Sequence, residues 1–206
     1  MTPDPWSAVT DELRGRLLPL SHEADLPSDT RHAAVSIVLR WMDGPEVLLM
    51  VRAEDENDPW SGHVALPGGH RDPGDVSLVH TASRETLEEV GVNLELCAHP
   101  IGLLESMQAR ARAKTMPLWV TPVIFLQHSP APIALGPEAS HAFHLPIRPL
   151  LAGHLDAEHP IERDHQVRRY PAWRFEERTI WGMTHHILTQ CLERVQDLPG
   201  FRDWNS

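Results

Sequence analysis

The sequence predicts an α+β protein, an α-β-α sandwich whose mixed sheet carries one loop-helix unit and a late C-terminal helix. Strands dominate, and apolar, β-branched segments at residues 32–41, 46–53 and 118–127 are typical of buried ones. A helix is expected from Asp75 or Ser77, either of which can cap it, to about Val90, because Gly91 follows. This mixture favours a sandwich over a doubly wound nucleotide-binding fold.

The remaining elements follow from shorter patterns. We expect a late helix over residues 178–198, because its apolar side chains recur at helical spacing. Shorter strands are expected at 63–69, within 94–109 and at 141–147, with a turn at 42–45 and a polar loop at 54–62. Residues 5–18 can form a short amphipathic helix, and residues 18–30 read as a linker.

The chain of 206 residues predicts one domain, with residues 1–30 as an N-terminal arm, 31–195 as the core and 196–206 as a tail. Its formal charge of -11 argues against non-specific nucleic-acid binding. Cys97 and Cys191 form no metal or disulfide pattern, and no apolar run reaches membrane-spanning length. No secretory signal is recognised at the start, so we expect a cytoplasmic protein without membrane partners.

The stretch from Leu66 to Leu94 joins a Gly-Gly turn to a helix that ends in a cluster of glutamates. Helical spacing places Glu85, Glu88 and Glu89 on one face, with Arg84 one turn before Glu88. Clustered carboxylates repel one another, and Mg²⁺, which prefers oxygen ligands and bridges carboxylates to phosphates, removes that conflict. A solvent-facing acidic helix end would explain the same spacing, so the pattern alone leaves both interpretations open.

The same stretch resembles the Nudix box, G-x5-E-x7-R-E-U-x-E-E-x-G-U, in which U is a bulky aliphatic residue. Gly69 is followed by five residues, then Asp75, then eight residues and the run from Arg84 to Val92. The second half matches at every charged position and at the glycine. The first half departs from the pattern because Asp replaces Glu and one extra residue precedes Arg84. Thr86 also occupies an aliphatic position.

These departures resemble the coenzyme A pyrophosphatase branch of the family. That branch also has an upstream strand, an Arg, and a Gly shortly before a Phe-Pro-Gly-Gly turn. The segments at residues 47–53 and 62–69 match its two ends, with Leu66 in place of Phe. The intervening Arg is missing, and Asn57 stands near its place. Downstream, "IWGMT" (180–184) resembles an Ile-Trp-Gly-x-Thr helix of the branch, and residues 143–151 resemble its strand-end segment.

The resemblance implies a Nudix fold and metal-dependent hydrolysis of a nucleoside diphosphate derivative, with coenzyme A or its thioesters as the expected substrates. It implies Mg²⁺ or Mn²⁺ as cofactor, held by Glu85, Glu89, Glu88 and the carbonyl oxygen of Gly69. Arg84 would keep the carboxylates in place. The general base would be a box glutamate, among them Glu85 and Glu88, or Glu138.

Three arginines are predicted to contact substrate phosphates. Arg52 ends a predicted strand, and Arg168 and Arg169 follow in a predicted loop, where a solvated role is the alternative for all three. Two alternative functions remain open: a Nudix hydrolase of nucleotide sugars, dinucleotides or oxidised nucleotides, and a non-catalytic Nudix-fold ligand sensor. The sequence leaves open whether the protein is a monomer or a homodimer.

Overall fold

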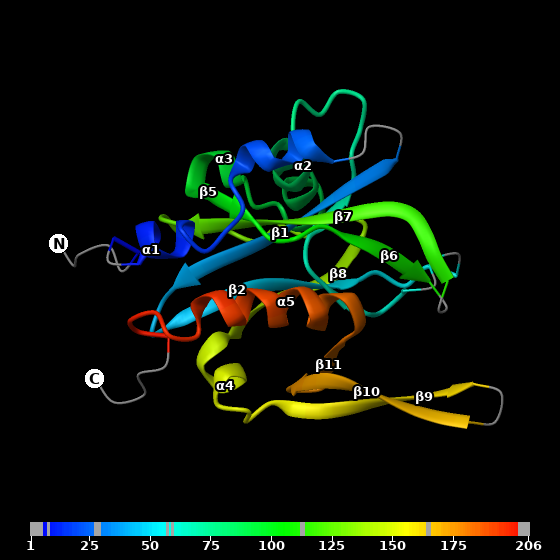
Figure 1. The fold of residues 1–206 in the computed structure, drawn as a ribbon. Coiled ribbons are helices and arrows are strands. Elements are labelled where there is room, and N and C mark those ends of the chain that lie inside the picture. Colours follow the sequence, from blue (N-terminus) through cyan, green and yellow to red (C-terminus); the bar gives the residue numbers. More distant parts are fainter. Residues whose placement is uncertain are drawn as a thin grey trace.

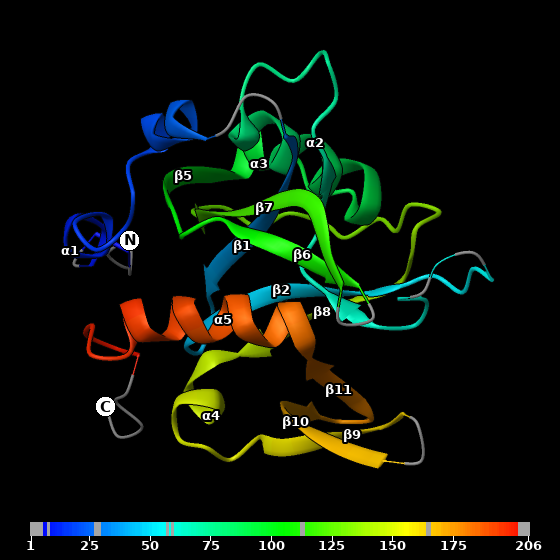
Figure 2. The ribbon, with the colours of Figure 1, turned by 45° about the vertical axis from the view of Figure 1, so that its right-hand side comes forward.

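The computed structural model describes residues 6–7, 9–26, 30–56, 58, 60–111, 114–163 and 166–201. It confirms the predicted α+β class: a mixed sheet lies between helices, with α2 on one side and α5 on the other (Figures 1 and 2). Helix α2 spans Leu78–Val90 and helix α5 spans Gly182–Val195. In the described part of the chain, no helix is long and apolar enough to cross a membrane.

The central sheet is built around β1 (Arg31–Trp41), which pairs in parallel with β7 (Lys114–Gln127) and antiparallel with β2 (Pro45–Arg52). Most β1 side chains are buried, as expected for a strand covered on both faces. The other strands of this sheet all pair antiparallel: β3 (Val64–Ala65), β4 (Gly68–His70), β5 (Ala98–Leu103), β6 (Met107–Ala111) and β8 (Ala139–Pro146).

Helix α2 begins and ends as the sequence predicts. The Ser77 side chain accepts a hydrogen bond from the His80 backbone N–H, and this satisfies one donor of the first helical turn. At the other end, Gly91 adopts a φ of 72° and its N–H bonds to the Leu87 carbonyl, which stops the helix. The glutamate run is therefore fixed at the last two turns of α2.

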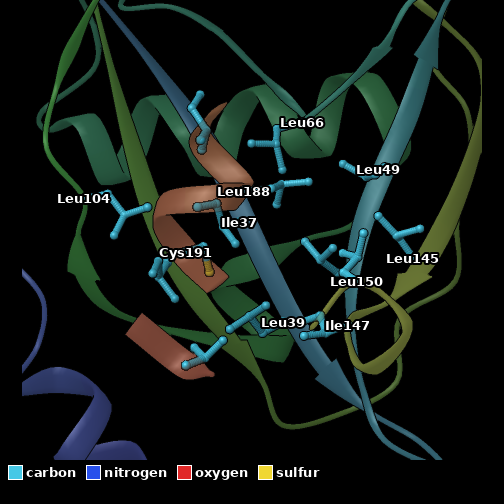
Figure 3. Packing of buried hydrophobic residues seen from close by; sticks show 14 of the residues in the cluster. Ile37, Leu39, Leu49, Leu66, Leu104, Leu145, Ile147, Leu150, Leu188 and Cys191 are labelled. Carbon is cyan, nitrogen blue, oxygen red and sulfur yellow. The ribbon is translucent and has the colours of Figure 1, made fainter. Parts of the chain in front are cut away.

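The hydrophobic core has two parts, one on each face of the sheet. Between the sheet and α5, Leu188 and Cys191 of the helix face Ile37 of β1 (Figure 3). On the opposite face, Leu78 and Ala82 of α2 belong to a second cluster with sheet residues such as Val38, Leu48 and Met50. Alternating residues of β1 and β2 thus serve opposite core layers, as the period of a strand requires.

The two ends of the chain are part of the main core. Trp6 packs against Trp41 and Phe201, with ring centroids 5.4 and 6.4 Å away. Leu13, in the short helix α1 (Thr10–Arg14), and Phe201 are fully buried. The predicted core boundaries of 31–195 therefore omit residues that complete it. Between α1 and β1, the segment read as a linker contains a 3-10 helix, η1 (Leu20–Asp25).

Two predicted elements differ in the structure. One or two strands were expected within 94–109, and β5 and β6 occupy most of that range, but its first four residues form a short helix, α3 (Leu94–Cys97), capped by Asn93. Residues 178–181 form β11 (Arg178–Trp181) and not the start of the late helix. Gly182, with a φ of 65°, changes the backbone direction between this strand and α5. The predicted helix was too long at its start because Ile180 stands at helical spacing from the apolar residues of α5.

A second, three-stranded sheet was not predicted. It consists of β9 (Asp156–Arg163), β10 (Gln166–Phe175) and β11, in the order β11-β10-β9. Its β9–β10 hairpin extends away from the main sheet (Figure 1). A short helix, α4 (Ile147–Leu151), connects β8 to this sheet. The proline and the arginines of β10 obscured the sequence pattern of a strand that pairs along its whole length.

We expect Leu13→Ala to lower the free energy of unfolding by about 2–5 kcal/mol, because it leaves a cavity at a side chain with 0% exposure. The matched control is Leu96→Ala, whose side chain is 75% exposed and should change stability by about 0.5 kcal/mol or less. Urea unfolding followed by circular dichroism measures both. Equal stability of the two variants would contradict the integration of the N-terminal residues into the core.

Candidate active site

The box glutamates of α2 face the turn that follows β3. Glu89 is buried, with 2% exposure, whereas Glu85 is partly buried and Glu88 is exposed. The backbone N–H of Gly68 donates a hydrogen bond of 2.8 Å to Glu89 Oε2. Strand β4 pairs with β1, so this turn is held against the central sheet while it contacts the end of α2.

The two glycines allow backbone to approach more closely than any side chain would permit. Gly68 has a φ of 151°, and a methyl group there would lie 2.5 Å from the Val35 Cα atom. At Gly69 a methyl group would lie 2.5 and 2.6 Å from the two carboxylate oxygens of Glu85. The Gly-Gly turn is therefore required by contact with β1 on one side and with α2 on the other.

Arg84 joins the carboxylates into one network. Its Nη1 donates to Glu85 Oε1 at 2.9 Å and to Glu88 Oε2 at 3.1 Å. Its Nη2 donates to the His70 carbonyl oxygen at 3.0 Å, which ties α2 to β4. Negative charge around it raises the pKa of Arg84 further above its ordinary range, so the guanidinium is a permanent cation in this network.

Asp75 binds the other side of the Arg84 guanidinium. Its carboxylate accepts from Arg84 Nε at 3.1 Å and from Nη2 at 3.0 Å, and it is almost completely buried. The Asp72 N–H and the Thr81 hydroxyl also donate to it. Hydrogen bonds from Arg84 hold the pKa of Asp75 well below its usual range. Asp75 thus orients Arg84.

Thr86, the departure at an aliphatic box position, is fully buried against β1. Its hydroxyl donates to the Ala82 carbonyl oxygen at 2.7 Å and is hydrogen-bonded to the Ser36 hydroxyl. Ser36 Oγ also lies 3.2 Å from the Pro67 carbonyl oxygen. A hydroxyl is tolerated here because a polar partner on β1 faces it, and the pair connects helix, strand and turn.

Burial makes the carboxylate cluster unfavourable without a cation. Desolvation raises the pKa of Glu89 to about 8, and the neighbouring charges of Glu85 and Glu138 act in the same direction. Desolvation also raises the pKa of Glu85. Divalent cations such as Mg²⁺ bind carboxylate oxygens and would reverse both shifts.

The donor set fits such a cation, although the described residues do not include three His, Cys, Asp or Glu side chains already arranged as a ligand set. Arg84 contacts one oxygen of Glu85 and one of Glu88, so the second oxygen of each can face a metal ion. Glu89 lies beside them on the same helix face, and the Gly69 backbone lies against Glu85. These are the four residues that the box predicts as ligands.

A cavity of about 530 Å³ opens beside this cluster and is lined by Gly69, Glu85, Arg52 and Glu138 among others. Glu138 is exposed in the turn before β8, and its carbonyl oxygen accepts a hydrogen bond from Ala53 N–H at 2.9 Å. Arg52, at the end of β2, pairs with Asp58 at 2.7 Å. The structure thus brings together residues from four separate segments of the chain.

Arg168 and Arg169 are not brought to this cavity. Both are exposed on β10, and Arg169 pairs with Glu158 of β9 at 3.3 Å. The prediction that they contact a substrate phosphate is not supported by their position. Asn57, near the place of the missing branch arginine, lies outside the described residues. His63 and Trp181 to Thr184 also line the cavity and were not predicted as site residues. The "IWGMT" motif was the sequence signal that could have indicated Trp181 to Thr184.

The fold and site define a hydrolase of the Nudix class. The NUDIX domain family model matches residues 30–162, and the chain belongs to this family. Its curated relatives include the uncharacterized Nudix hydrolase NudL of Yersinia pestis (strain Pestoides F) and of Yersinia pseudotuberculosis (serotype O:1b, strain IP 31758). Each is 31% identical over 180 residues, covering 85% of each protein.

A solved MutT/nudix family protein from Enterococcus faecalis has the same fold, with a TM-score of 0.51 and 19% identity, over 86% of this chain and 67% of that one. Family membership makes the protein a pyrophosphohydrolase that acts on nucleoside diphosphate derivatives. Enzymes of this family generally use divalent cations such as Mg²⁺ or Mn²⁺.

We expect Gly69→Ala to lower kcat/KM by about a hundredfold while the protein remains folded, because the added methyl group displaces the Glu85 carboxylate. The matched control is Gly74→Ala, because a methyl group there would have no neighbour within 4 Å. Release of phosphate-containing products with Mg²⁺ or Mn²⁺ measures both variants. Full activity of Gly69→Ala would mean that the close approach to Glu85 is dispensable.

We expect Glu89→Gln to stabilise the metal-free protein increasingly as the pH rises from about 5 to about 8. The folded-state pKa of Glu89, about 8, exceeds the ordinary value of 4.5, so the folded state retains a proton that the unfolded state loses. Wild-type stability therefore falls with pH in this window, by about 1.4 kcal/mol per pH unit at most.

The gap between Glu89→Gln and wild type should close below pH 4.5 and shrink when Mg²⁺ is added. Chemical unfolding in a chelator across this pH range measures the gap, with Glu95→Gln, an exposed glutamate of α3, as the control. A gap that does not vary with pH would contradict the buried, protonated state of Glu89.

Proposed function

We propose that the protein is a metal-dependent coenzyme A pyrophosphatase of the cytoplasm. It would hydrolyse the diphosphate bond of coenzyme A or its thioesters to 3′,5′-ADP and a phosphopantetheine product. Family membership supports the diphosphate chemistry, and three separate sequence segments that resemble the coenzyme A branch support the substrate.

One observation carries the choice of substrate: three of the four segments that resemble the branch line a single cavity, whereas residues 143–151 do not. Arg52 comes from the upstream strand, His63 to Gly69 from the segment before the box, and Trp181 to Thr184 from the "IWGMT" segment. The last segment lies about a hundred residues beyond the box in sequence, and its presence beside Glu85 is not required by the box itself. The resemblance is therefore concentrated where a substrate would be bound.

The residues around the cavity can divide the work of hydrolysis. Glu85, Glu88, Glu89 and the Gly69 carbonyl oxygen would hold a divalent cation, which when bound neutralises the diphosphate and favours deprotonation of water. Asp75 and Arg84 keep these carboxylates in place. A water molecule would attack phosphorus, the P–O bond of the diphosphate bridge would break, and the water proton would pass to Glu138 or to a box glutamate such as Glu85.

Arg52 is the remaining candidate to contact a substrate phosphate, since it lines the cavity and Arg168 and Arg169 do not. The missing branch arginine keeps nucleotide sugars and dinucleotides as alternative substrates. A non-catalytic sensor is disfavoured because it would not need the glutamate set, Arg84 and Asp75 in this arrangement. Neither a nucleic-acid partner nor a homodimer is required by this proposal.

We expect coenzyme A to be cleaved with a higher kcat/KM than NADH, ADP-ribose or diadenosine compounds in Mg²⁺ or Mn²⁺. Arg52→Gln should lower kcat/KM for coenzyme A by about tenfold to a hundredfold, because a charge-assisted contact contributes about 1.5–3 kcal/mol. Arg168→Gln is the matched control and should resemble wild type. Mass spectrometry of the products and initial rates for each substrate measure these differences.

Dephospho-coenzyme A extends this test. If Arg52 reads the 3′-phosphate, dephospho-coenzyme A should be the poorer substrate for wild type, and Arg52→Gln should remove the difference. If Arg52 contacts the diphosphate, Arg52→Gln should lower kcat/KM for both substrates by the same factor. A preference of wild type for another diphosphate over coenzyme A would reject the proposed substrate and leave the family assignment intact.

A further inference from the structure

The cavity is lined by two chemically different sets of residues. One set carries the charged groups Glu85, Arg52, Glu138 and Asp72. The other set is aliphatic and forms what we call the pit: Ala33, Val35, Val64, Leu66, Ala109, Leu118, Val120, Met183 and Ile187. Because both sets line one cavity, a molecule whose diphosphate lies against the charged groups has the pit within its reach.

The pit is a place where the hydrophobic core opens. Its residues belong to the core cluster between the sheet and α5, or pack against it. Core residues deeper in this cluster, such as Ile37 and Leu39, have 0% exposure, whereas Ala33, Val120 and Leu118 of the pit retain 6%, 5% and 8%. Strands β1 and β6 lie on either side of β7 in the sheet, and each contributes a small side chain to the cavity wall, Ala33 and Ala109.

Aromatic side chains form the rim of the pit. Trp181 lines the cavity at the start of α5, and the His159 ring from β9 stacks on it with centroids 4.2 Å apart. The His63 ring, from the segment just before β3, also contacts Trp181, with ring centroids 5.3 Å apart. Burial lowers the pKa of His63, so the imidazole is neutral at pH 7 and places no charge at the rim. The second sheet thereby fixes the position of Trp181.

None of the nine pit residues carries a side-chain N–H or O–H group. The only hydroxyl among the described residues that line the cavity is that of Thr184, and it donates to the Val64 carbonyl oxygen at 3.0 Å. A nucleobase inserted among these residues would find no side-chain partners there for its ring nitrogens and exocyclic groups, and unpaired buried polar groups weaken binding. A hydrocarbon group has no such penalty and gains from burial.

We propose that the pit binds a hydrocarbon-bearing group on the non-nucleoside side of the diphosphate, and that the nucleobase lies elsewhere. This inference rests on the proposed function for its diphosphate chemistry and deepens it. In coenzyme A, the carbon chain that begins at the diphosphate carries two methyl groups close to the phosphate, which suits an aliphatic wall beside Glu85 and Gly69.

The test uses alkyl esters of ADP, with methyl, butyl and hexyl groups on the β-phosphate, made non-hydrolysable by a methylene bridge between the phosphorus atoms. Calorimetry with Mg²⁺ measures their dissociation constants. We expect affinity to rise about threefold for each methylene that enters the pit, given about 0.8 kcal/mol for full burial of one CH₂. Equal affinity of the methyl and hexyl esters would overturn the inference.

Ala109→Leu, which fills the pit, should reduce the ratio of hexyl to methyl affinity by about tenfold or more. The matched control is Ala152→Leu, an exposed position outside the cavity, which should keep the wild-type ratio. Thermal melts confirm that both variants fold, and the wild-type series stands alone if Ala109→Leu does not. An unchanged ratio in folded Ala109→Leu would also overturn the inference.

The same compounds separate this inference from the proposed substrate. If coenzyme A is not cleaved but affinity still rises with chain length, the substrate proposal fails and the pit assignment stands. If coenzyme A is cleaved but chain length has no effect, the pit assignment fails and the substrate proposal stands.

Discussion

The contact between the Gly68–Gly69 backbone and the carboxylates of α2 is the constraint on which the site depends. It requires a strand, β4, that begins with two residues without side chains, and a helix whose last turns point glutamates at that strand. Only one of these carboxylates, Glu89, receives a hydrogen bond from the Gly-Gly turn, through Gly68 N–H. The fold thus buries these carboxylates, and desolvation, with a smaller contribution from neighbouring carboxylates, raises the pKa of both Glu85 and Glu89.

Arg84 and Asp75 make this concentration of charge tolerable before any cation binds. A lone arginine would be free to fold onto any of the glutamates, but Asp75 fixes two of its nitrogens and His70 supplies a carbonyl oxygen. The guanidinium can then contact Glu85 and Glu88 without neutralising both oxygens of either. The arrangement leaves oxygen ligands available while it lowers the repulsion between them.

The sequence predicted the parts of this structure that depend on local signals. Ser77 and Gly91 set the limits of α2, and helical spacing placed the glutamates on one face, because caps and spacing act within a few residues. The burial of Trp6 and Phe201 depends on contacts between the two ends of the chain, which no local pattern reports. Arg168 and Arg169 were predicted to contact phosphate, yet they are exposed on the β9–β10 hairpin and do not line the cavity.

The site therefore combines the box, whose role can be predicted from the sequence, with other segments that come together only in the folded structure. The box supplies Asp72 and Glu85 to the cavity, and its glutamates would serve any diphosphate. The aliphatic residues come mainly from β1, β6, β7 and α5, and Trp181 is placed beside this cavity by a second sheet that had no recognisable signal in the sequence. Under the proposals made above, discrimination between substrates therefore depends on Arg52 and on these aliphatic residues.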